Sequence, residues 1–146
     1  RPVSPGGYRE DEDVMMMNAM LVGNAFPLSL IRRPVLMTPV SKRIFTDALV
    51  HSTIVSFWGH HNTLKAAKQQ FGVDLTPDTE RPAIQLNEHK LPVLKMVFDT
   101  CWVISPDYSP GFRPAVGEEV PPEAIQAWQV IKIEWQHLRG NEGGRF

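Results

Sequence analysis

Residues 52–72 of this chain read STIVSFWGHHNTLKAAKQQFG, and this stretch decides the fold. Its first part, Ser52 to Trp58, mixes β-branched and aromatic residues, as strands do. After Gly59 the apolar positions change to a spacing of about 3.6 residues, which is typical of an amphipathic helix. Gly72 then supplies a natural C-terminal stop. The stretch therefore predicts a strand that turns through Gly59 into a helix of roughly ten residues.

The segments on either side add further strands and short helices. We expect strands over 15–25, 35–40, 82–86, 92–98, 101–104 and 130–135, a helical turn over 28–31, short helices over 41–49 and 121–128, and irregular chain over 74–81 and 105–117. Pro39 places its strand at an edge of the sheet or ends it. Ser41 and Asn62 are the expected helix caps. Strands mixed with two or three helices indicate a small α/β fold, in which the helices pack on a mixed β-sheet.

Length and composition indicate one globular domain. The chain has 146 residues, of which 42% are hydrophobic and 21% charged, and it shows no internal repeat. We expect a single α/β domain over 14–137. A flexible leader over 1–13 is expected to precede it, and a disordered tail over 138–146 to follow it.

Charge and cysteine content narrow the possible functions. The net charge of −1 argues against a protein that coats long nucleic acid, because such binding requires many contacts of Lys and Arg with phosphate. The single Cys101 cannot form an internal disulfide, and no apolar stretch approaches the roughly 18 residues of a membrane span. We therefore expect a soluble, cytoplasmic protein. A small anionic ligand is compatible with this charge.

The junction Gly59-His60-His61-Asn62-Thr63 is the candidate site. A helix that begins there presents free backbone N–H groups, which together with the helix dipole attract anions such as phosphate. An imidazole can also donate a proton to a leaving oxygen near neutral pH. The alternative interpretation is a capped helix start with two partly exposed histidines, and the residues alone favour it. No Cys pair or His-x3-His spacing accompanies the histidines, so we expect neither a metal nor a cofactor.

Arginines are the other candidates for contact with phosphate, because a guanidinium offers a bidentate pair of donors. They are Arg32, Arg33, Arg81 and Arg113. Arg113 lies in the Pro- and Gly-rich loop 105–117, and such loops often carry function on a rigid scaffold. Tryptophans at apolar positions are expected in the core or in an interface, and these are Trp58, Trp102, Trp128 and Trp135.

With these residues placed, residues 20–135 resemble the viral ring nuclease family. Its members are anti-CRISPR proteins that degrade the cyclic tetra-adenylate messenger of type III CRISPR systems, and they have cellular relatives. The resemblance rests on four features in the same order. These are a strand ending in Asn24-Ala25-Phe26, the junction 59–63 resembling the family's G-H-x-S-T, Gly72 followed by Glu80-Arg81, and a loop with Arg113 that leads through Gly117 to a short helix and an aromatic strand.

The resemblance implies a small α/β homodimer with one cyclic nucleotide bound across its two-fold axis. In the family the reaction needs no metal: a ribose 2′-hydroxyl attacks the adjacent phosphate, and a histidine protonates the departing 5′-oxygen. His60 matches this histidine, and Arg113 matches the loop arginine that stabilises charge on the phosphate. The ligand-binding positions that the resemblance implies are Asn24, Phe26, Asn62, Thr63 and Arg81.

Several positions differ from the family pattern, and they leave other functions open. Pro27 stands where the family has a ligand-contacting serine, and Asn62 replaces the serine of the motif. Val116 stands where the family has an acid, which Glu118 or Glu119 would have to replace. A second function is therefore sequestration of a cyclic nucleotide immune signal without cleavage. A third is an interaction module whose aromatic strands form a protein interface.

Overall fold

The computed structural model describes residues 18–115 and 117–137, which form a five-stranded sheet, a three-stranded sheet and two α-helices. The large sheet has the order β2-β8-β7-β1-β3 and the small one the order β4-β5-β6. The strands are β1 (Ala19–Gly23), β2 (Val35–Val40), β3 (Thr53–Ser56), β4 (Gln85–Leu86), β5 (Pro92–Leu94), β6 (Met96–Val97), β7 (Thr100–Tyr108) and β8 (Ile125–Trp135). The helices are α2 (Lys42–Val50) and α3 (His61–Phe71), with short 3-10 turns η2 (Leu28–Leu30) and η3 (Pro122–Ala124). The α/β fold expected from the sequence is confirmed.

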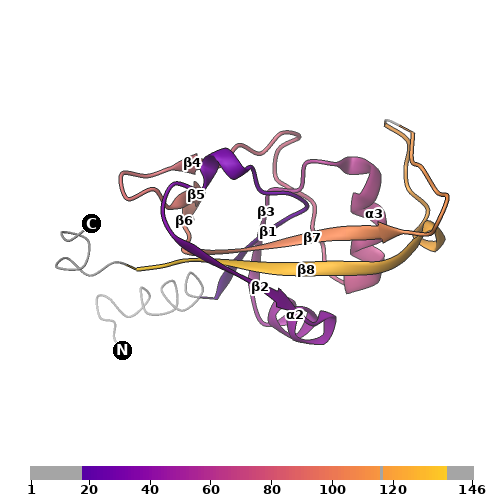
Figure 1. Ribbon diagram of the computed structural model, residues 1–146, viewed down its shortest axis with the longest axis horizontal. Helices are drawn as coiled ribbons and strands as arrows, with labels where there is room; N and C mark the ends of the chain where they lie inside the picture. The colour runs from indigo at the N-terminus through magenta and orange to yellow at the C-terminus, as the bar shows by residue number, and fades with distance from the viewer. Residues whose placement is uncertain (1–17, 116, 138–146) are drawn as a thin grey trace, which may run out of the picture.

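The large sheet is mixed, and its parallel part positions the candidate site. β1 lies between β3 and β7 and runs parallel to both, whereas β8 is antiparallel to β7 and β2. Figure 1 shows the β7–β8 hairpin along the length of the molecule, with its loop projecting at the end where α3 lies. Since β1 and β3 are parallel, their carboxyl ends meet at one edge of the sheet, and α3 begins there.

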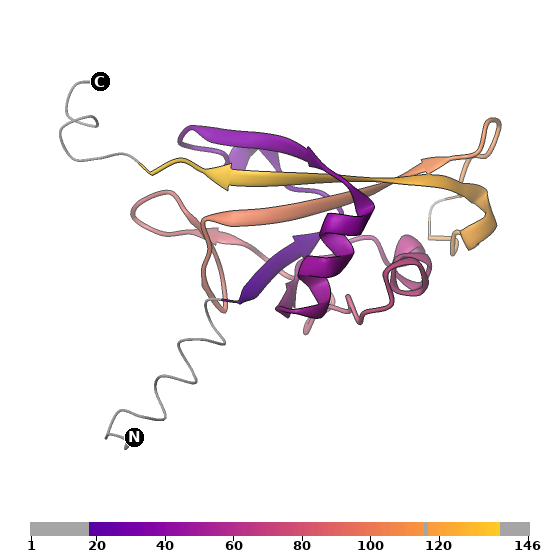
Figure 2. The ribbon, with the colours of Figure 1, turned by 90° about the horizontal axis from the view of Figure 1, so that it is seen from below.

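The sheet separates two apolar clusters, as the alternation of side chains along a strand requires. Met20 and Val22 of β1 pack with α2 and α3, whose buried contributors are Phe45, Leu49, Leu64, Ala67 and Phe71. Leu21 faces the other way and packs with Phe57, Phe98, Ile133 and Trp135. Figure 2 shows both helices on one side of the β7–β8 hairpin. The helices therefore cover one face, and the segments around 26–35 and 84–98 pack on the other.

The two helices begin and end largely as predicted. The Ser41 side chain accepts a hydrogen bond of 3.1 Å from the Ile44 N–H and so caps α2. Gly72 follows α3 with a positive φ of 72°, which favours glycine. The predicted cap of α3 is wrong: its N-cap is His60, which makes no side-chain capping bond, and Asn62 is the second residue of the helix. The helix starts earlier because the His60 carbonyl already accepts the Thr63 N–H.

The region 105–128 departs most from the sequence prediction. Ser105 to Tyr108, expected as irregular chain, continue β7, and the expected helix over 121–128 is only the turn η3 before β8 begins at Ile125. The two extensions pair with each other, so a cross-strand partner overrides the local preference. Pro106 is tolerated because β1 pairs with β7 only up to Val103, which leaves the outer side of Pro106 unpaired.

Smaller differences lie in the other strands. The strand expected over 82–86 is two residues long, and the one expected over 92–98 is broken at Lys95, which turns with a positive φ of 68°. Within the expected first strand, the described part is strand over Ala19–Gly23. The expected leader 1–13 and tail 138–146 lie outside the described residues. In the part of the chain that is described, no helix has the length and apolar character needed to cross a membrane.

We predict that Gly23→Ala destabilises the fold strongly, because a Cβ at position 23 would lie 2.3 Å from the Phe57 ring. Overpacking of this kind typically costs about 1–3 kcal/mol. Urea unfolding followed by tryptophan fluorescence measures the change. Gly59→Ala is the matched control, since its nearest neighbour would be the Asn24 side chain at 3.8 Å. Equal stability of the two variants would contradict the prediction.

We also predict that Cys101 reacts only after unfolding. Its thiol is fully buried on β7, and burial raises the pKa of Cys101 to about 12. The reactive thiolate is therefore present at pH 8 in roughly one molecule in ten thousand. An aromatic disulfide reagent should leave the native protein unmodified and label it stoichiometrically in denaturant. Fast labelling without denaturant would mean that β7 opens readily.

Candidate functional site

The edge where β1 and β3 end brings Asn24 to the Gly59 junction. Phe57 N–H donates to the Val22 carbonyl at 2.8 Å, so the pairing of the two strands continues one residue beyond β3. Asn24 Oδ1 then accepts the Gly59 N–H at 2.7 Å. The side-chain oxygen of Asn24 is therefore used within the protein, whereas its amide NH₂ group makes no hydrogen bond to the residues that the structure describes.

A buried network holds the start of α3. Trp58 is fully buried, and its indole N–H donates to the His60 carbonyl at 2.9 Å. The Thr63 hydroxyl also donates to this carbonyl, at 3.2 Å, and Thr63 is only 4% exposed. Thr63, predicted to bind ligand, thus lies in the core of the junction. His60 and His61 are exposed, and Asn62 is half-buried.

The β7–β8 loop is fastened to the same turn of α3. Val120 N–H donates to the Asn62 carbonyl at 2.7 Å, and Glu119 lies 3.7 Å from the Lys65 ammonium. A hollow of about 570 Å³ lies between the loop and the helix, lined by His61, Asn62, Leu64, Lys65, Lys68, Gly117 and Glu119. The loop that carries Arg113 is therefore attached next to the junction.

Phe26 supports the junction from the other face of the sheet. Its ring contacts Phe57 edge to face at a centroid distance of 6.1 Å and Trp135 at 5.3 Å. Phe26 is half-buried. Its structural contacts are thus to the apolar cluster beneath Asn24.

The arginines fall into two groups. Within the described residues, no hydrogen bond or ion pair engages Arg81 or Arg113, and both side chains are exposed. Arg33, in contrast, donates to the carbonyls of His89 and Gln136, and Arg32 donates to that of Ser29. Arg33 therefore joins segments of the fold, whereas Arg81 and Arg113 are available to a ligand. Val116 lies outside the described residues.

Beyond the C-terminal end of α3, Asp74 has a lowered pKa. The side chain and backbone N–H of Thr76 hydrogen-bond to Asp74 and hold the pKa of that carboxyl below its usual value, with Lys68 adding attraction. Asp74 is exposed, and it lies after the helix rather than at the junction.

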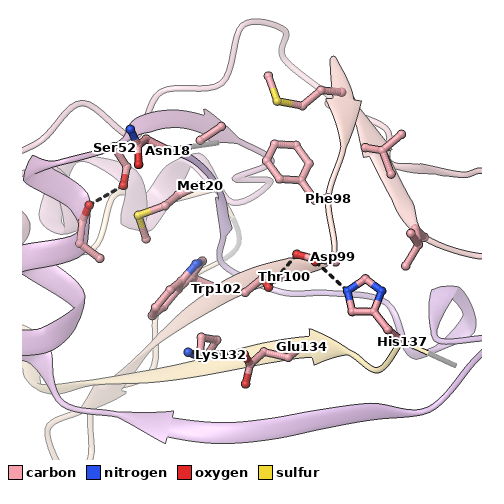
Figure 3. Close-up of a pocket in the computed structure, with 15 residues that line it drawn as sticks. Asn18, Met20, Ser52, Phe98, Asp99, Thr100, Trp102, Lys132, Glu134 and His137 are labelled. Atoms are coloured by element: carbon pink, nitrogen blue, oxygen red, sulfur yellow. Dashed lines mark hydrogen bonds and ion pairs between the residues drawn. The ribbon is translucent and has the colours of Figure 1, made fainter. Parts of the chain in front are cut away.

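A second hollow of about 570 Å³ lies at the opposite, amino end of β1 and β7 (Figure 3). Its charged side chains are paired with each other: His137 Nε2 lies 3.1 Å from Asp99, and Lys132 Nζ lies 3.7 Å from Glu134. Lys132 also lies 5.3 Å from the centre of the Trp102 ring. None of the predicted site residues lines this hollow. No group of three metal-ligating side chains occurs among the described residues of the chain.

This arrangement was compared with known proteins. No protein-family model matches the chain, and no curated protein sequence matches it. A solved structure does match. The fold is similar to that of B116 from Sulfolobus turreted icosahedral virus. The match has a TM-score of 0.52 at 15% identity and covers 81% of this chain and 99% of that one, so the likeness is one of fold.

Sequence reasoning missed the residues that position the junction. Gly23 and Phe57 act through close packing and Trp58 through a buried hydrogen bond, and no sequence motif marks such roles. The sequence did contain an indication for Trp58: it directly precedes Gly59, and a buried indole N–H needs a hydrogen-bond acceptor, which the nearby turn supplies. Val120 carried no signal, since its role is a backbone hydrogen bond.

We predict that Asn24 has a structural and a binding role that can be separated. Asn24→Ala removes the acceptor of the Gly59 N–H and should cost about 0.5–1.5 kcal/mol of stability. Asn24→Asp keeps an acceptor oxygen and should retain most of that stability. The Asp variant should nevertheless bind phosphate ligands more weakly, because a carboxylate repels phosphate and lacks the NH₂ donors. Thermal unfolding with and without cyclic tetra-adenylate measures both effects. Equal stability of the Ala and Asp variants would contradict the structural role.

Proposed function

We propose that this protein binds a cyclic oligoadenylate, most specifically cyclic tetra-adenylate, and cleaves it without a metal. The observation that carries the proposal is the Asn24–Gly59 contact, because it gathers an amide NH₂ group, the start of α3 and the exposed His60 at one edge of the sheet. The similarity of the fold to a viral protein supports the ring nuclease resemblance of the sequence. The reaction would switch off or counteract type III CRISPR signalling in the cytoplasm.

The proposed reaction uses groups of the ligand and of this chain. A ribose 2′-hydroxyl attacks the adjacent phosphorus, and the bond from phosphorus to the 5′-oxygen breaks, which leaves a 2′,3′-cyclic phosphate and a 5′-hydroxyl. The 2′-hydroxyl loses its proton to solvent water, and the His60 imidazolium donates a proton to the departing 5′-oxygen. Arg113 stabilises the charge that develops on the phosphate oxygens. Asn24, Phe26, Asn62 and Arg81 are proposed as ligand-binding residues. Thr63, whose buried hydroxyl donates to the His60 carbonyl, is proposed to contribute by holding the junction in place.

A homodimer suits this ligand. A cyclic tetranucleotide has rotational symmetry, and two copies of the junction related by a two-fold axis would face the ring from both sides. The pair would also supply two copies of Arg81 and Arg113, which the described fold leaves exposed. The chain's net charge of −1 is compatible with a ligand of four phosphates if these arginines converge on it.

Sequestration without cleavage is the second candidate function. Val116 stands where the family has an acid in the loop, and Asn62 stands where it has a serine. Either difference would slow the chemical step more than binding, because charge develops only in the transition state. Such a protein would lower the concentration of free messenger by binding alone.

The test is incubation with cyclic tetra-adenylate in EDTA, with the products separated by chromatography. We predict linear products from the wild type and a loss of cleavage of about a hundredfold or more in His60→Ala. His61→Ala is the matched control, because His61 is a neighbouring exposed imidazole of the same junction and should leave cleavage nearly unchanged. Intact ligand recovered after heat denaturation would indicate sequestration. No binding of cyclic tetra-adenylate would exclude it as the ligand and would turn the search to other ring sizes or partners.

A further inference from the structure

The His60 carbonyl accepts an unusual number of hydrogen bonds for the start of a helix. Three donors reach it: the Trp58 indole at 2.9 Å, the Thr63 hydroxyl at 3.2 Å and the Thr63 N–H at 3.3 Å. The indole N–H also lies 3.2 Å from the Thr63 hydroxyl oxygen. Two of the donors belong to side chains that are at most 4% exposed. The His60 peptide is thus fixed from inside the core.

The His60 side chain has no comparable support. Within residues 18–115 and 117–137, no hydrogen bond or ion pair holds its imidazole, and the residue is exposed. The direction of the ring therefore depends on the backbone of His60, which has φ −105° and ψ 100°. Fixing the carbonyl fixes ψ, and with it the direction of the Cα–Cβ bond relative to α3.

Trp58 is itself held on both sides. Its ring packs in the cluster beneath α2 and α3, where its neighbours include Met20, Leu64 and Phe71. Its backbone N–H donates to the Ser56 hydroxyl at 3.2 Å, and that hydroxyl donates to the Leu75 carbonyl at 2.6 Å. A rigid connection therefore runs from the chain that follows α3, through the indole, to the backbone of His60.

We infer that Trp58 is the positioning residue for His60: its indole N–H sets the backbone from which the imidazole reaches the scissile phosphate. The inference rests on the proposed function for its catalytic consequence. Its structural part, that the indole holds the His60 carbonyl, stands independently of any ligand. A general acid that is misplaced by a fraction of an ångström protonates its leaving oxygen more slowly, although the substrate still binds.

The chain offers a matched pair of substitutions for the test. Trp58 and Trp135 are both buried, at 0% and 2% exposure, but Trp135 Nε1 is a buried donor without a partner among the described residues. Trp58→Phe and Trp135→Phe therefore remove the same atoms from the core, and only the first removes hydrogen bonds. Amide hydrogen exchange of Thr63, measured relative to Phe71 in the same helix, reports on the His60 carbonyl. Steady-state cleavage of cyclic tetra-adenylate reports on the chemistry.

In Trp58→Phe we expect faster relative exchange at Thr63 and a kcat lowered about ten- to a hundredfold with KM nearly unchanged. Trp135→Phe removes no hydrogen bond of the junction and should therefore change both quantities much less. Unchanged exchange at Thr63 would overturn the inference, and so would an equal loss of kcat in both variants or a loss confined to KM. If the wild type cleaves no ring, the proposed function fails, and the exchange measurement alone decides whether Trp58 holds His60.

Discussion

The contact between Gly23 and the Phe57 ring is the constraint on which the candidate site depends. The ring occupies the space that any side chain at position 23 would need. The Phe57 N–H meanwhile bonds to the Val22 carbonyl, so β1 and the chain after β3 remain side by side past the last paired residues. Only this extended pairing brings Gly59 within reach of the Asn24 side chain. Phe26 contacts both Phe57 and Trp135 and so ties the contact to β8.

Phe57 and Trp58 are consecutive residues whose side chains pack on opposite faces of the sheet. Phe57 packs in the cluster with Trp135, whereas Trp58 packs beneath the helices. Phe57 thereby controls where the chain passes Asn24, and Trp58 controls how it enters α3. The exposed histidines need no packing of their own, because both flanks of the turn are fixed from below. A polar site is thus built on two independent apolar supports.

The sequence predicted the parts that are encoded locally. The helix of residues 61–71 follows from its apolar spacing and Gly72, the cap of α2 from Ser41, and the edge position of β2 from Pro39, which lacks an N–H for a second neighbour. It missed the long β7–β8 pairing, because Ser105 to Tyr108 gain their extended form from a partner about twenty residues away. For the site, the family resemblance singled out Asn24 and the junction as separate ligand-binding positions, and the contact between them was not predicted. The buried roles of Thr63 and Trp58 depend on tertiary hydrogen bonds that no local pattern records.

The strand order also determines which parts of the sheet can form while the chain is being synthesised. β1 and β3 are neighbours that are both synthesised before β7 and β8, so the edge that carries Asn24 and Gly59 can begin to assemble before those strands exist. β2 is made between them, yet in the described sheet it pairs only with β8, the last strand. Leu36 and Met37 of β2 therefore have no partner strand in this sheet until β8 has been synthesised, and they remain about half exposed in the complete fold. Between the synthesis of β2 and that of β8 the nascent chain therefore carries an open, partly apolar strand edge, and such edges are sites where chaperones can bind.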